Sequence, residues 1–311
     1  NVRDKTWEHV WSVNGNGIAD SLWSNQIILE VSGNKFQRPG FKFRFSNYST
    51  LSGAFDHWHI DYVRMDDGIS ETSLDTIADV AYLSGFGSYF NEYTSVPYSH
   101  YLAAPIDLQG DNNQLIVRNL GVEAIYLDAL KFELKDETNA TLLTATDIID
   151  NFGPNTVAIK NYTLPNSQIF PDLDKERVFF ETTCSFKVTG NNDERINDTI
   201  RSTTEMWDYY SYDDGTAESA YALTGAGLTL AYEFESPVED TLPAIYFNFP
   251  QMLHDDNGDL DFAIKIWSNL NENPIYEDIG YRIPSYTRGN EFARYELQED
   301  VIVNGTFYVG F

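Results

Sequence analysis

The stretch FDHWHIDYVRM, residues 55–65, contains residue types that bind metals, at the spacing of an extended strand. Side chains of one parity share a face of a strand, so His57, His59 and Asp61 would lie on one side. Two imidazoles and a carboxylate form a ligand set that zinc accepts, and calcium is an equal candidate at the carboxylate. The same face continues into a valine and a methionine. We therefore interpret the stretch first as the closing strand of a β-sandwich, and second as a metal site.

The acidic stretch HDDNGDLD, residues 254–261, is a second candidate metal site. Its candidate oxygen ligands are Asp255, Asn257, Asp259 and Asp261. Hard oxygen ligands at alternating positions around a glycine are what calcium loops need. The spacing departs from an EF-hand, because the glycine comes later and no bidentate glutamate stands at the expected distance. Calcium is therefore a candidate cofactor, and a solvated acidic hairpin is the competing interpretation.

Three tryptophans, Trp23, Trp207 and Trp267, together with the tyrosines of DYYSY, are candidates for a stacking platform. Flat apolar rings flanked by carboxylates are suited to hold sugar rings. Core packing is the competing interpretation, since large aromatic side chains are mostly buried. A glycan ligand at Trp207 and Trp267 is therefore a hypothesis that depends on the exposure of the two rings.

The segment YDDGTAES, residues 212–219, places Asp213, Asp214 and Glu218 close together. Glycosidic hydrolysis needs two carboxyl groups across a cleft, which one local loop rarely provides. The competing interpretation of these residues is an Asp-Gly turn that leads into a strand. The sequence also has no nucleophile elbow, zinc-protease helix, phosphate loop or dinucleotide fingerprint. We predict that the protein is not an enzyme.

The composition favours an all-β protein and excludes two classes of partner. Aromatic residues make up 15% of the 311 residues, and such side chains fill β-sheet cores and cross-strand pairs. Acidic residues number 48 against 20 basic ones, which gives a formal charge of −28. This charge repels nucleic acid and anionic membrane surfaces. No stretch approaches the roughly 20 apolar residues of a membrane helix, so direct membrane insertion is not expected.

Short runs of alternating residues predict three β domains. In GFKFRFSNY, Phe41, Phe43 and Phe45 alternate with cations, which predicts three rings facing a core. In FETTCSFKV the single cysteine, Cys184, falls among strand residues as a small buried hydrophobe. The expected order is a jelly-roll β-sandwich (its C-terminal part) over 1–68, a connector over 69–105, an immunoglobulin-like β-sandwich over 106–207 and a second jelly-roll-like β-sandwich over 208–311. The two outer domains are expected to be incomplete within this chain.

Several stretches resemble segments of large multidomain Bacteroidetes proteins exported by the type IX secretion system. They are FKFRFSNYSTLSGAFDHWHIDYVRM, DTIADVAYL, YTSVPYSHY, YYSYDDGTAESAYAL and GTFYVGF. The first is also similar to the last strands of jelly-roll domains of the MAM and carbohydrate-binding type, which often end in Trp-x-Ile-Asp-x-Val. Those letters fall here on Trp58, Ile60, Asp61 and Val63. The resemblance implies a cell-surface or extracellular location and no catalytic residues to carry over. The C-terminal sorting domain of such cargo is not found in the chain, and we expect it in a longer parent.

Taken together, these patterns predict a non-catalytic secreted or cell-surface β-sandwich protein. We expect it to act as a structural, adhesive or complex-forming component, with other cell-surface or outer-membrane proteins as partners. The alternative is a glycan-binding accessory region of a larger extracellular hydrolase. The exposure of Trp207 or Trp267 on a concave face discriminates between the two.

Overall fold

The computed structural model describes the chain in several parts. The described residues are 7–14, 27–34, 36–48, 58, 60, 63–65, 78–189, 195–215, 221, 223, 225, 227–249, 260–287 and 291–311. Within them the regular structure is almost entirely β strand, with two short α-helices and one turn of 3-10 helix at Arg195–Asn197. This confirms the all-β prediction. None of the helices in these ranges has the length and apolar character needed to cross a bilayer.

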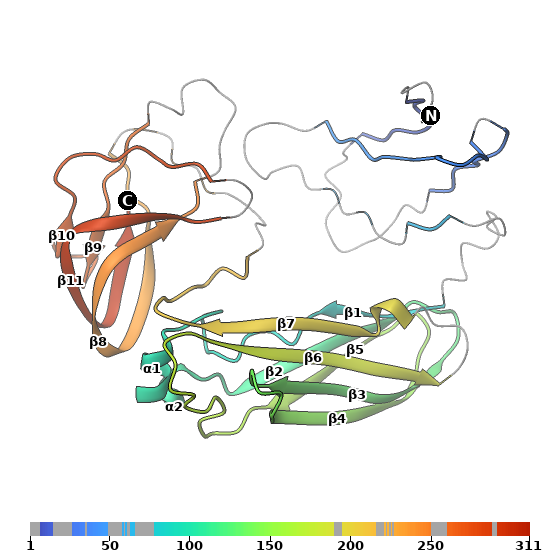
Figure 1. Ribbon diagram of the computed structural model, residues 1–311, viewed down its shortest axis with the longest axis horizontal. Helices are drawn as coiled ribbons and strands as arrows, with labels where there is room; N and C mark the ends of the chain where they lie inside the picture. The colour runs from blue at the N-terminus through green and yellow to red at the C-terminus, as the bar shows by residue number, and fades with distance from the viewer. Residues whose placement is uncertain are drawn as a thin grey trace.

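The middle of the chain folds into two antiparallel sheets that share one core (Figure 1). The first sheet has the order β1 (Val80–Ser84), β2 (Asn112–Asn119), β5 (Val157–Thr163). The second has the order β4 (Thr141–Phe152), β3 (Ile125–Lys135), β6 (Val178–Thr189), β7 (Thr199–Met206). A sandwich is what the sequence predicts for this region, and its immunoglobulin-like topology stays a prediction.

Strand β6 shows why this part of the sequence folds as it does. Buried and more exposed residues alternate along its whole length, so that Val178, Phe180 and Cys184 face the core. Burying a large apolar side chain stabilises a fold by about 1.5–3 kcal/mol. The cysteine behaves as the small hydrophobe that we predicted, and burial raises the pKa of its thiol to about 12.

The segment that precedes β2 is part of the sandwich. We expected a connector over 69–105, but its described part, 78–105, contributes β1 and helix α1 (Tyr98–Ala103), and α2 (Pro105–Leu108) follows. The most deeply buried rings of this segment are Phe86, Tyr89, Tyr98 and Tyr101. The sequence hides this role because most of these side chains come from loops and a helix, which have no period of two.

The C-terminal part forms one four-stranded antiparallel sheet. Its order is β10 (Tyr276–Glu277), β9 (Lys265–Trp267), β11 (Ala293–Gly310), β8 (Ala231–Phe247). Two register irregularities interrupt the long β8–β11 ladder, and Figure 1 shows both strands strongly curved. One apolar cluster packs on this sheet, with Ile264 and Phe307 at its centre. The second jelly roll expected over 208–311 stays a prediction.

The N-terminal part differs from the expectation. Among its described residues none is paired in a strand, and Phe43 and Phe45 are 54% and 56% exposed. The prediction that these two rings face a core is therefore wrong in this structure. An alternating pattern shows which side chains share a face, but it does not show whether another layer covers that face.

Candidate functional site

Aromatic rings of the sandwich pack against β8 of the C-terminal sheet. We call this contact the seam, and its residues are Tyr93, His100, Tyr210, Tyr212, Phe234, Ser236 and Asp240. The ring centroid of Tyr93 lies 4.8 Å from that of Tyr210 and 4.7 Å from that of Tyr212. The Tyr212 centroid lies 5.2 Å from that of Phe234, which stacks at 5.6 Å on Phe307 of β11. The cores of the two β units therefore meet at Phe234.

Two tyrosines of the seam bond to the backbone of β8. This strand lies at the edge of its sheet, so no described strand pairs with the outer side of its backbone. The Tyr93 hydroxyl accepts the backbone N–H of Glu235 at 2.7 Å and donates to the carbonyl of the same residue at 3.0 Å. The Tyr212 hydroxyl donates to the carbonyl of Glu233 at 2.7 Å. Burial raises the pKa of both phenols, so both remain protonated at neutral pH.

His100 is the buried titratable group of the seam, with 5% of its surface exposed. Its Nε2 lies 3.0 Å from Oδ2 of Asp240, and its Nδ1 lies 2.8 Å from the hydroxyl of Tyr210. A carboxylate needs a donor, so the neutral ring carries its proton on Nε2 and accepts the phenol proton at Nδ1. Burial lowers the pKa of His100, and the Asp240 carboxylate acts in the opposite direction.

Ser236, His100 and Asp240 have the residue types of a hydrolase triad, but their geometry is structural. The Ser236 hydroxyl donates to the carbonyl of Val238 at 2.7 Å, and it lies 3.4 Å from Nδ1 of His100. Tyr210 also reaches the serine oxygen, at 3.1 Å. Ser236 is only 1% exposed, so a substrate carbonyl has no access to its oxygen. We interpret the three residues as part of the contact between the β units.

A pocket of about 380 Å³ opens beside the seam. Its walls come from α1, from the loop before β6, from the end of β7 and from β8. The lining residues are Pro97, Tyr98, Ser99, Leu102, Lys175, Glu176, Trp207, Asp208 and Asp240. Asp240 belongs to both the pocket and the seam, because its carboxylate also contacts His100.

Trp207 is held in place through its backbone and its ring. Its carbonyl accepts the backbone N–H of Tyr98 at 2.8 Å, which fixes the residue against α1. The guanidinium carbon of Arg177 lies 4.7 Å from the ring centroid, in cation–π contact. Arg177 does not line the pocket, and 38% of Trp207 remains exposed. The backbone bond thus positions the residue against α1, and Arg177 packs on its ring.

Negative charge dominates the pocket. Three of its lining residues are acidic and one, Lys175, is basic. Lys175 forms an ion pair with Glu137, and the neighbouring Arg177 forms one with Glu205. The cations near the pocket are therefore already neutralised, and the remaining carboxylates disfavour an anionic ligand.

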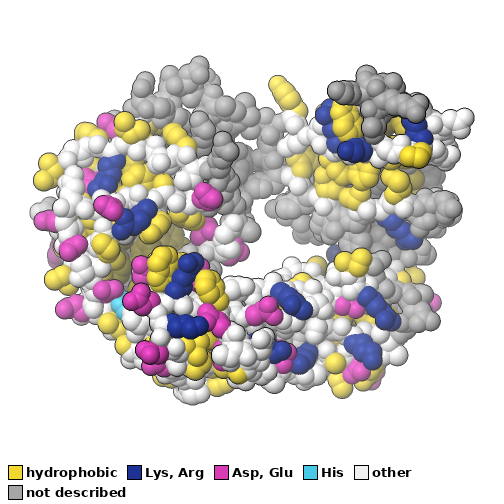
Figure 2. All heavy atoms as spheres, viewed as in Figure 1, with side chains coloured by type: hydrophobic (Ala, Val, Ile, Leu, Met, Phe, Trp, Pro, Cys, Tyr) yellow, Lys and Arg dark blue, Asp and Glu magenta, His cyan; other side chains and the backbone are white. Residues whose placement is uncertain are grey.

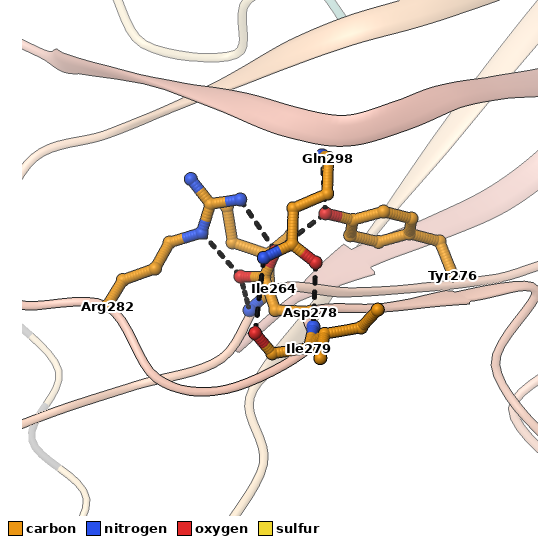
Figure 3. A network of polar contacts seen from close by, with 6 residues as sticks. All are labelled: Ile264, Tyr276, Asp278, Ile279, Arg282 and Gln298. Carbon is orange, nitrogen blue, oxygen red and sulfur yellow. Dashed lines mark hydrogen bonds and ion pairs between the residues drawn. The ribbon is translucent and has the colours of Figure 1, made fainter.

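A second polar network lies in the C-terminal sheet (Figure 3). The side chain of Asp278 is fully buried and bonds in a bidentate way to Arg282, at 2.5 and 2.6 Å. Its oxygens also accept the Tyr276 hydroxyl at 2.6 Å and the Ile264 backbone N–H at 2.9 Å. The Tyr276 hydroxyl accepts the backbone N–H of Gln298 on β11 at 2.9 Å. These contacts join β10 and β11 to the residue that precedes β9, so the network is structural.

The structure distinguishes the two tryptophans proposed as a glycan site, Trp207 and Trp267. Trp207 is partly exposed and lines the pocket, whereas Trp267 is 8% exposed and belongs to the buried set. A ring so deeply buried has little face to offer a sugar, so of these two only Trp207 stays a candidate for the platform. Trp23, the third candidate, lies outside the described residues. The Asp-Gly turn is present at Asp213, whose carboxylate accepts the backbone N–H of Gly215 at 2.7 Å.

The two candidate metal sites lie mostly outside the described residues. The structure does not describe His57, His59 and Asp61 of the first site, or Asp255, Asn257 and Asp259 of the second. Asp261 is described and is exposed. In the part of the chain that the structure describes, no three His, Cys, Asp or Glu side chains lie close enough to hold a metal ion. Zinc and calcium binding at these stretches stay predictions.

Sequence reasoning missed the seam. Its partners are far apart along the chain, with Ser236 and His100 separated by 136 residues. Two features of the sequence could have pointed to this contact. They are the density of tyrosines in YYSYDD, residues 209–214, and the histidine between two tyrosines in YSHY, residues 98–101. Neither run shows an amphipathic period that would identify its partner.

Comparison with known proteins gave no match, either to a protein-family model or to a curated protein sequence. The resemblance to exported surface proteins therefore stays an expectation from the sequence.

The pH dependence of stability tests the role of His100. Because its pKa is lowered in the folded protein, the folded state binds fewer protons than the unfolded state just below pH 6.5. The free energy of unfolding should therefore decrease as the pH falls from about 7 toward the folded pKa of His100, by about 1.4 kcal/mol for each unit of lowering. Urea denaturation at several pH values measures this. The His100→Gln variant should lack this loss of stability below pH 7. An identical pH dependence of the free energy of unfolding in both proteins would contradict the role assigned to His100.

Asp278→Asn tests the network of the C-terminal sheet. Burial acts to raise the pKa of Asp278, but bonds from its three partners outweigh burial and lower it. Stability from this group is therefore present above about pH 4 and is lost as the pH falls through the folded pKa. We expect the substitution to cost about 2–4 kcal/mol at pH 7, because it weakens a buried bidentate ion pair. The matched control is Glu277→Gln, which removes an exposed pair with Lys265 and should cost under about 1 kcal/mol. Equal losses in denaturant melts would refute a special role for Asp278.

Proposed function

We propose that the protein is a non-catalytic structural and adhesive component of a bacterial cell surface, exported through the type IX secretion system. The observation that carries the structural role is the seam. Adjacent domains of one chain usually move relative to each other, unless a large or specific interface holds them. Here the hydroxyls of Tyr93 and Tyr212 bond directly to the backbone of β8. A contact of this kind suits a protein that holds its parts at a fixed distance.

The surface composition supports an exterior location. The formal charge of −28 keeps copies of the chain apart in solution. In Figure 2, acidic and basic side chains are interspersed over the described parts of this face, without one large patch of either sign. Export through the type IX system is supported by the sequence resemblance described above.

Exposed apolar side chains near β10 support a role in complexes. Ile279, Tyr281 and Ile283 are 89%, 77% and 70% exposed, and they occupy alternate positions along the chain. Neighbouring exposed apolar residues are typical of surfaces that contact another protein. We propose other cell-surface or outer-membrane proteins as the partners of this surface.

The location of the protein in the producing bacterium tests the proposal. Intact cells should lose the protein when an external protease is added, whereas a strain without a working type IX apparatus should retain it inside, protected. A periplasmic protein examined in parallel controls for leakage. Protection from protease in both strains, or release independent of the apparatus, would contradict the proposed location and export route.

A further inference from the structure

We propose that the pocket beside the seam binds a saccharide that carries no negative charge. The pocket volume of about 380 Å³ lies within the range of about 300–1,000 Å³ that is typical of small-molecule sites. The inference rests on the pocket residues alone. It therefore holds or fails independently of the export route and of the structural role.

The aromatic wall of the pocket is Trp207. Sugar rings present flat faces of C–H groups, which pack on an indole ring when that ring is exposed and held in one orientation. In Trp207, 38% of the residue is exposed, the Tyr98 backbone anchors its main chain, and Arg177 packs on its ring. A ring that already packs against a neighbouring side chain loses less conformational entropy when a ligand binds than a freely rotating one does.

The polar wall suits hydroxyl groups. Glu176 and Asp208 form no ion pair or hydrogen bond with the described part of the chain, so their oxygens are available as acceptors. Sugar hydroxyls are donors that such carboxylates accept in charge-assisted bonds. Sulfated, sialylated or uronic acid sugars would meet the same carboxylates with repulsion. The class that fits is a neutral saccharide or one that carries an amino group.

Asp240 links the pocket to the seam. One of its oxygens contacts His100, its side chain is still 49% exposed, and it lines the pocket. A ligand hydroxyl bound to Asp240 would therefore touch a residue that joins the two β units. Occupancy of the pocket would add a further contact across that junction.

Binding by the whole chain tests the inference. The probes are an array of neutral and amino-bearing oligosaccharides, with sulfated and uronic acid oligosaccharides on the same array, followed by calorimetric titration of the best binder. Trp207→Ala should lower the affinity about tenfold or more. The matched control is Trp58→Ala, because Trp58 is similarly exposed, at 44%, and does not line the pocket.

A second variant separates binding from folding. Asp208→Asn keeps the size of an exposed side chain and removes only its charge, so it should fold normally and bind several-fold more weakly. Thermal melts of all variants establish that they are folded. Absence of binding to every neutral and amino-bearing probe, preference for anionic probes, or equal affinity of Trp207→Ala and Trp58→Ala would each overturn the inference.

Discussion

The structure depends on how the outer edge of β8 is bonded. An edge strand presents backbone donors and acceptors that another strand, water or side chains have to satisfy. In this protein the hydroxyls of Tyr93 and Tyr212 bond to these backbone groups at Glu233 and Glu235, and their rings pack between the two β units. The same contact therefore satisfies part of the outer edge of β8 and joins the core of the C-terminal sheet to that of the sandwich, and the seam reaches the pocket through Asp240.

Buried polar groups make this contact specific. A buried imidazole costs free energy unless its two nitrogens have partners, and His100 has Asp240 on one side and Tyr210 on the other. Apolar packing alone would tolerate small shifts between the two units, whereas these bonds hold only in one arrangement. The exposed part of Asp240 extends the same set of contacts into the pocket. Asp240 is thus shared by the junction and the pocket.

The sequence predicted those elements that follow from local periodicity. The alternation along β6 placed Cys184 in the core correctly, and the aromatic content indicated an all-β chain. The sequence did not predict features that depend on tertiary contacts. Phe43 and Phe45, for example, alternate as core residues do but are 54% and 56% exposed. Trp207 was identified as a candidate by residue type, but only the fold shows that it lines a pocket while Trp267 is buried. The pairing of His100 with Asp240 joins distant segments, and no period in either segment indicates it.

The most direct test of a fixed junction is the distribution of distances between two spin labels across the seam. Suitable sites are Ile159 on β5 and Ile302 on β11, which are 56% and 66% exposed. Each is replaced by cysteine for labelling, in a Cys184→Ala background. We predict one narrow distribution for the otherwise unchanged chain, and a broader one after Tyr93→Phe combined with Tyr212→Phe. Tyr246→Phe, at an exposed site on β8 outside the seam, should leave the distribution narrow. A broad distribution in the chain with both seam tyrosines intact would contradict the account.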